Sequence, residues 1–216
     1  MQEEFGLQIP ETLQEACDPR RAALLVYDMQ IGVLRQVPER DRIVDAVGRV
    51  LEAARRAGVR VFFFRHMSLP KNLAGVFQLR QAMAWQRVAT VDEVEPWFLR
   101  DSPGFPITPE LQARPTEAVF DKITMSAFEG TPLDIALRDC GVDVFVVVGV
   151  AIEIGIEPTV RHGTDLGYIP VVVTDACGAG NEAAGTRTVD GMRFTGDAFV
   201  TDTDTICGIW DSRVTT

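Results

Sequence analysis

The sequence predicts an α/β fold, a single-domain three-layer αβα sandwich with a mostly parallel sheet of about six strands. Strongly apolar runs, such as residues 22–27 and 142–150, are typical of strands that are covered on both faces. Segments of helical period lie between these runs, and this alternation is typical of βαβ units. The chain has 216 residues, of which 46% are hydrophobic, so it can bury one core of ordinary size.

The expected elements follow one another through the whole chain. In order they are an N-terminal arm (1–20) and then, within one domain (21–216), a strand (22–27), a helix (41–57), a strand (59–64), a possible helix near 73–87 in an otherwise irregular stretch (66–116), a strand (118–120), a helix (131–140), a strand (142–150), a helix from 157, and strands at 169–174 and 198–200.

Local signals support these assignments. Residues 41–57 carry apolar side chains at helical spacing, and Gly58 follows as a stop. Thr131 and Pro132 are expected to be the N-cap and the first residue of the next helix. Five prolines between residues 96 and 115 argue against a long regular element there, so that stretch is expected to form loops that shape a pocket.

Charge and composition exclude several classes of partner. The net charge is -10 and the sequence pI is about 4.7, which disfavours nucleic acid and anionic membrane surfaces. The longest apolar run, 144–152, is too short to cross a bilayer, and the acidic start does not resemble a secretory signal. The four cysteines are far apart and lack C-x-x-C spacing. We therefore expect a cytoplasmic protein.

Polar residues follow several of the predicted strands. In open α/β sheets, ligands bind beyond the carboxyl ends of the strands. Asp28 ends the first strand, Arg65 and His66 end the second, Lys122 follows the third, and residues 150–155 follow the fourth. An aspartate and a lysine that meet there can run acid/base chemistry. From strand position alone, catalytic and structural roles are equally well supported.

Three segments together carry a resemblance to a known family. They are LLVYDMQ, VFDKITMSAFEGTPL and VVVGVAIEIGIEPTVRHGTDLGYIPVVVTDA. In order and spacing they resemble the signature segments of the isochorismatase-like (cysteine) hydrolases, over about residues 20–178. The resemblance implies a Rossmann-like sheet, a small-molecule substrate, no cofactor, and assembly into a homo-oligomer, either a dimer or a tetramer.

The resemblance also implies roles for individual residues. Asp28 matches the catalytic aspartate, Lys122 the catalytic lysine, and Val150-Ala151 a cis peptide that shapes the substrate site. Gly155 stands at the position of the nucleophilic cysteine, so thiol catalysis is excluded at that position. True isochorismatases resemble this chain in having glycine there.

Further residues are expected to line the substrate site, and for one of them, Glu153, two roles are consistent with the sequence. The expected substrate-binding residues are Gln30, Phe63, Arg65, Phe128, Val150, Ala151 and Glu153. Burial near Phe63 and Phe128 would allow Asp28 to act as an acid. Glu153 either activates water or is a carboxylate at the start of a helix. His66 and His162 are not in a metal-binding arrangement, so no metal is expected.

Three functions are consistent with the sequence. The leading hypothesis is a metal-free hydrolase of a small anionic metabolite that uses Asp28 and Lys122 for vinyl ether cleavage of the isochorismatase type. The second is hydrolysis of a C–N bond, with water activated by Glu153 or Asp28. The third is a catalytically silent relative that binds a metabolite or serves as a subunit.

Overall fold

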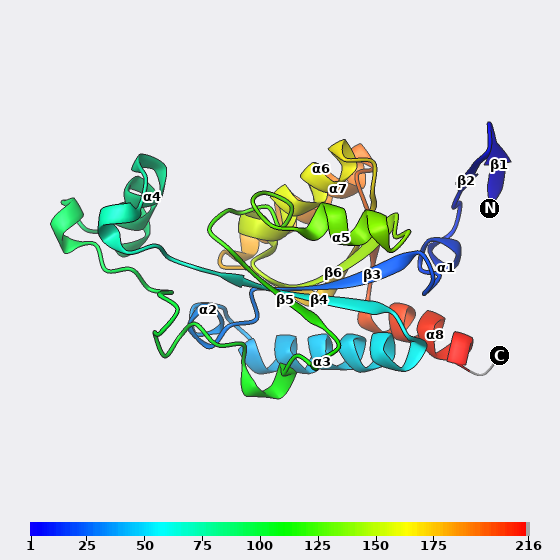
Figure 1. Ribbon diagram of the computed structural model, residues 1–216, viewed down its shortest axis with the longest axis horizontal. Helices are drawn as coiled ribbons and strands as arrows, with labels where there is room; N and C mark the ends of the chain where they lie inside the picture. The colour runs from blue at the N-terminus through cyan, green and yellow to red at the C-terminus, as the bar shows by residue number, and fades with distance from the viewer. Residues whose placement is uncertain (215–216) are drawn as a thin grey trace.

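The computed structural model describes residues 1–214, and its centre is a six-stranded sheet (Figure 1). All of its strand pairs are parallel, in the order β5-β4-β3-β6-β7-β8. The strands are β3 (Ala22–Tyr27), β4 (Arg60–His66), β5 (Ala118–Lys122), β6 (Val144–Val150), β7 (Ile169–Gly178) and β8 (Phe199–Thr201). The predicted fold class is confirmed.

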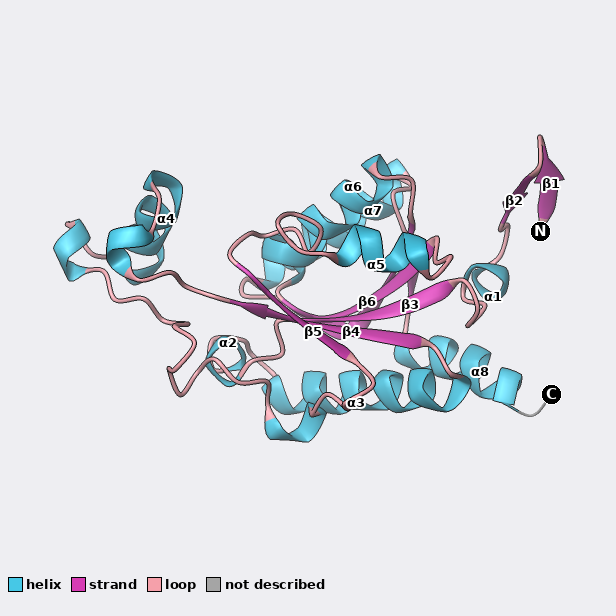
Figure 2. Ribbon diagram, viewed as in Figure 1, coloured by secondary structure: helices cyan, strands magenta, loops and turns pink. Residues whose placement is uncertain are grey.

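Helices cover both faces of this sheet, and each face has its own apolar core (Figure 2). Helices α3 (Arg40–Ala57) and α8 (Thr203–Val214) lie on one face, and α5 (Leu133–Asp139), α6 (Glu157–Asp165) and α7 (Glu182–Thr195) lie on the other. Every residue of β3 is buried, and successive side chains point to opposite faces. The continuous apolar run in the sequence is therefore that of a central strand.

Several details differ from the sequence-based expectation, which includes neither α7 nor α8. The helix expected to start at Pro132 begins at Leu133, because the Thr131 hydroxyl accepts a hydrogen bond from the Leu133 N–H while Pro132 still lies outside the helix. Strand β7 continues to Gly178, four residues further than predicted. It reaches the loop that borders the site described below.

The N-terminal segment forms a small hairpin followed by a short helix. Strands β1 (Gln2–Glu4) and β2 (Leu7–Ile9) pair with each other and lie at the outer end of the molecule in Figure 1. Helix α1 (Leu13–Ala16) joins them to the domain, where Cys17 is buried and its carbonyl accepts a hydrogen bond from Trp210.

The region between β4 and β5 first projects from the other end of the molecule and then returns to α3, against which its residues Pro109–Leu111 pack (Figure 1). It holds helix α4 (Val76–Gln86), which confirms the helix predicted near 73–87, and three short 3-10 turns (Lys71–Leu73, Val91–Glu93 and Pro109–Leu111). None of the α4 residues is buried. Helix α2 (Ile31–Leu34) lies on the main body, and no helix within residues 1–214 is long and apolar enough to cross a bilayer.

Candidate active site

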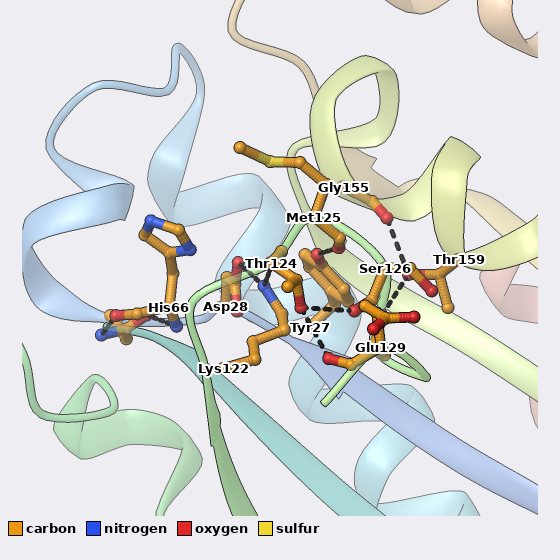
Figure 3. Close-up of polar contacts among 12 residues, drawn as sticks. Tyr27, Asp28, His66, Lys122, Thr124, Met125, Ser126, Glu129, Gly155 and Thr159 are labelled. Carbon is orange, nitrogen blue, oxygen red and sulfur yellow. Dashed lines mark hydrogen bonds and ion pairs between the residues drawn. The ribbon is translucent and has the colours of Figure 1, made fainter. Parts of the chain in front are cut away.

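Asp28 and Lys122 meet at the carboxyl ends of the central strand β3 and the edge strand β5 (Figure 3). Asp28 follows β3, and Lys122 is the last residue of β5. Lys122 Nζ donates to Asp28 Oδ2 at 2.8 Å and to the carbonyl of Thr124 at 3.3 Å. Its exposed fraction is 2%, and that of Asp28 is 7%. Two residues 94 positions apart therefore form a buried ion pair at the edge where ligands bind in such sheets.

The ion pair has an aromatic ring beside its ammonium group and a cavity beside its carboxylate. Burial lowers the pKa of Lys122, and the Asp28 carboxylate opposes that shift. The ammonium also lies 4.2 Å from the centre of the Tyr27 ring, a cation–π contact. Asp28 Oδ1 is buried and has no hydrogen-bond partner among the described residues. Asp28 therefore carries an unsatisfied carboxylate oxygen at the wall of the cavity described next.

A cavity of about 500 Å³ opens in front of Asp28. Its walls come from the ends of β3, β4 and β6 and from the projecting region around α4. The lining residues used below are Tyr27, Asp28, His66, Trp85, Arg87, Trp97, Phe98, Met125, Val150, Ala151, Glu153, Gly155 and Asn181. The site therefore combines aromatic walls with a floor that carries two carboxylates.

Gly155 lines the cavity, but the space beside it is already filled. A β-carbon on Gly155 would lie 2.6 Å from Cζ of Tyr27 and closer still to its hydroxyl oxygen. Contacts below 3.0 Å are essentially never made by real β-carbons, so a side chain at position 155 requires Tyr27 to move. The Tyr27 hydroxyl donates to the carbonyl of Met125, and burial raises the pKa of Tyr27 well above its usual value. The phenol therefore stays protonated.

Three of the predicted substrate-binding residues lie in the cavity wall. Val150 ends β6 and is joined by a cis peptide bond to Ala151, and Glu153 lies two residues further. Glu153 Oε1 accepts from the backbone N–H of Asn181 at 2.8 Å, whereas Oε2 is buried without a partner among the described residues. Glu153 thus places a second unpaired carboxylate oxygen in the cavity wall.

Phe63 and Arg65 are not in the cavity, and the expectation that they line it is wrong. Alternate residues of a strand face opposite sides of the sheet. Phe63 packs in the core on the α3 face, whereas Phe64, on the same side as His66, stacks against Tyr27. Arg65 binds Asp121 at 2.7 Å and lies over the Phe105 ring.

Phe128 and Gln30 are also packed within the fold and do not line the cavity. Phe128 packs in the core against Phe145 and Tyr168 and does not line the cavity, so the prediction for it is wrong as well. Gln30 is fully buried, and its amide donates to the carbonyls of His66 and Phe105 while its oxygen accepts from the His66 N–H at 2.6 Å. Gln30 therefore holds the end of β4 in place and does not reach the cavity.

His66 lines the cavity, although it is not among the site residues predicted from the sequence. It ends β4 beside the ion pair, and burial, followed by the nearby Lys122 charge, lowers its pKa to about 4. It is therefore uncharged at neutral pH. Its strand-end position is visible in the sequence, but the face to which it points is not. The other histidine, His162, contacts Ser126 at 3.0 Å through Nδ1 and lies outside the cavity.

A second group of unassigned residues comes from the projecting region. Trp85, Arg87, Trp97 and Phe98 form one wall of the cavity. The sequence predicts that loops of this region shape a pocket, but it does not show which of these side chains face Asp28. Within residues 1–214, no three histidine, cysteine, aspartate or glutamate side chains are grouped to hold a metal ion.

Comparison with known proteins agrees with this architecture. Residues 22–205 match the isochorismatase domain. Ureidoacrylate amidohydrolase RutB of Acinetobacter baylyi is 28% identical over 183 residues, covering 78% of this chain and 74% of that protein. RutB of Serratia proteamaculans is also 28% identical, over 77% of this chain and 73% of that protein.

Solved structures show the same fold. A cysteine hydrolase from Pseudomonas syringae pv. phaseolicola has a TM-score of 0.78 at 25% identity, over 92% of this chain and 96% of that chain. N-carbamoylsarcosine amidase from Thermoplasma acidophilum has a TM-score of 0.69 at 22% identity, over 85% and 97%, and shows the fold alone. With its domain match, its six-stranded parallel sheet and its buried Asp28–Lys122 pair, this chain belongs to the isochorismatase family of hydrolases.

Proposed function

We propose that this hydrolase cleaves a C–N bond in a small amide or ureido compound by adding water directly to the carbonyl group. The observation that carries the proposal is the unpaired, buried Oδ1 of Asp28, which lies beside an ammonium group in a cavity that contains no cysteine. Relatives named ureidoacrylate amidohydrolase, at 28% identity, support the bond type.

Direct addition of water needs a base but no nucleophilic side chain. Asp28 Oδ1 takes a proton from water, and the resulting hydroxide adds to the carbonyl carbon. The C–N bond then breaks, and Asp28 returns the proton to the departing nitrogen, so that the products are a carboxylic acid and an amine. Lys122 stays cationic throughout and stabilises the negative charge that forms next to it.

Tyr27 fills the space that a side chain at position 155 would need, which supports a mechanism without a thioester. Its hydroxyl donates to the Met125 carbonyl, which leaves the oxygen lone pairs available to accept a hydrogen bond. We place the reacting water between Asp28 Oδ1 and this oxygen. In this arrangement Asp28 takes the proton and Tyr27 orients the water.

The charges in the cavity favour a substrate that brings N–H groups. Asp28 Oδ1 and Glu153 Oε2 are both unpaired acceptors, and amide or ureido nitrogens are donors. Among the described residues that line the cavity, Arg87 carries the one positive charge. Lys122 is buried and does not line the cavity. We therefore favour a neutral amide or ureide over the anionic metabolite predicted from the sequence.

Vinyl ether hydrolysis is the second candidate, and the glycine at position 155 favours it through the resemblance to isochorismatases. That reaction needs Asp28 to donate a proton to carbon. The Lys122 ion pair presents Asp28 as an acceptor instead. For this reason we rank C–N hydrolysis first.

A turnover screen separates the two candidates. The wild-type protein is incubated with ureidoacrylate, a panel of small amides and ureido acids, and isochorismate, and ammonia, amine and pyruvate are measured. We expect ammonia or amine release, reduced about 10²- to 10⁴-fold by Asp28→Asn. Pyruvate release from isochorismate alone would establish the second candidate, and turnover unaffected by Asp28→Asn would refute the proposed mechanism.

A further inference from the structure

A second cavity adjoins the one in front of Asp28. It measures about 300 Å³ and lies between α4, the segment 94–98 and the segment 123–125. Five residues line both cavities: His66, Trp85, Trp97, Phe98 and Met125. The two spaces therefore share one wall, and a ligand that contacts this wall from the Asp28 side is next to the second cavity.

The second cavity is apolar and has few free polar groups. Its apolar lining comprises Met67, Leu69, Phe77, Leu79, Ala82, Val94, Pro96 and Ile123, in addition to the shared aromatic residues. Some of the polar side chains there are engaged with the backbone, whereas those of His66, Gln81 and Glu95 make no hydrogen bond within residues 1–214. Lys71 Nζ donates to the Asp92 carbonyl, and the Gln86 amide exchanges two hydrogen bonds with the backbone of Glu95. This lining suits a group that does not need hydrogen bonds.

The protein does not fill this space with its own core. Helix α4 has no buried residue, and Val76 and Phe77 are 87% and 67% exposed. Large apolar side chains left open to water in this way typically mark binding surfaces. Phe77 lines the second cavity, which shares a wall with the cavity in front of Asp28, so the substrate of that first cavity is the occupant to expect.

We propose that the second cavity binds an apolar substituent of the substrate while the reacting carbonyl group lies at Asp28. The placement of the carbonyl group rests on the proposed function. The substrate class is then an amide or ureide that carries an alkyl or aryl group of several carbon atoms. The shared wall of Trp97, Phe98 and Met125 would contact the bond between the two parts.

Binding of a homologous series tests the proposal without requiring turnover. We would measure Kd by isothermal titration calorimetry for acetamide, butanamide, hexanamide and 4-phenylbutanamide, with Asp28→Asn as the protein if the wild type hydrolyses them. Burial of each methylene should tighten binding about fourfold until the cavity is full. A Kd that does not change with chain length would overturn the proposal.

Two alanines of α4 provide a matched pair of variants. Ala82 lines the second cavity, whereas Ala84 is exposed on the same helix and lines neither cavity. Ala82→Trp should remove the dependence on chain length and leave acetamide binding unchanged, and Ala82→Leu should reduce the dependence partly. Ala84→Trp should behave as wild type. Equal effects of Ala82→Trp and Ala84→Trp would refute the cavity as the binding site.

The outcomes also separate this inference from the proposed function. Affinity that rises with chain length, without ammonia release from any amide, would support the cavity and contradict C–N hydrolysis. Ammonia release from acetamide and hexanamide at equal kcat/KM, with equal Kd, would support C–N hydrolysis and contradict the cavity.

Discussion

The two sides of the catalytic cavity are built in different ways. Tyr27, Asp28 and Lys122 lie at the ends of the parallel strands β3 and β5, and each of these residues is at least 93% buried. Trp85 and Trp97, on the other side, come from the projecting region and are 44% and 38% exposed. Strand register fixes the first group within the core, whereas few tertiary contacts hold the second. We conclude that the sheet determines the chemistry of the site and that the projecting region determines which substrates fit.

The largest expected effect concerns the buried ion pair. Lys122→Met removes the ammonium and leaves Asp28 as an uncompensated buried charge, which should lower the free energy of unfolding by about 3 to 5 kcal/mol. Urea unfolding followed by circular dichroism measures it. The control is Arg49→Met, which breaks the exposed Arg49–Asp204 pair and should cost less than about 1 kcal/mol. Similar losses in the two variants would contradict the proposed difference between core and surface.

The next effect is the steric match between Tyr27 and Gly155. Gly155→Ala places a β-carbon against the phenol and should destabilise the protein by about 1 to 3 kcal/mol. In a Tyr27→Leu background the same substitution should cost much less, so that a double-mutant cycle gives a clear interaction energy. If the costs of the two substitutions simply added, Tyr27 would not be what occupies the space beside Gly155.

The sequence predicts the chemical side of the cavity well because parallel sheets leave a clear pattern. The buried run before Asp28 and the strand before Lys122 end at the same edge of the sheet, which places the two side chains together. The faces of β4 are less clear, because residues 61–64 are all apolar and show no alternation. Phe63 therefore entered the predicted site, and His66 was left out.

The aromatic wall could not be predicted for another reason. Trp97 lies in a stretch rich in proline, which is expected to shape a pocket but has no periodicity that relates sequence to space, and Trp85 lies near the end of α4. Helix α4 was expected, but an isolated helix without a buried face carries no signal for the direction in which it packs. Only the folded chain shows that this region borders Asp28.

A further effect concerns His66, which lies where the two sides of the cavity meet. Its pKa is about 4 in the folded protein, against an ordinary value near 6.5, so between these pH values the unfolded chain binds more protons. Stability should therefore fall as pH decreases from about 6.5 to about 4, by about 2 to 3 kcal/mol from this residue. The difference between wild type and His66→Asn across this range isolates the effect from the titrating carboxylates. A difference that does not change with pH would show that His66 is not buried beside the ion pair.

The smallest expected effect is the loss of one hydroxyl group. Tyr27→Phe keeps the ring that supports Lys122 and fills the space beside Gly155, but it removes the oxygen that we place next to the reacting water. One neutral hydrogen bond contributes about 0.5 to 1.5 kcal/mol, so kcat should fall about 3- to 10-fold while KM changes little. Steady-state kinetics on the best substrate from the screen measures both constants. An unchanged kcat, or a loss confined to KM, would remove Tyr27 from the reaction and leave it the single role of filling the space beside Gly155.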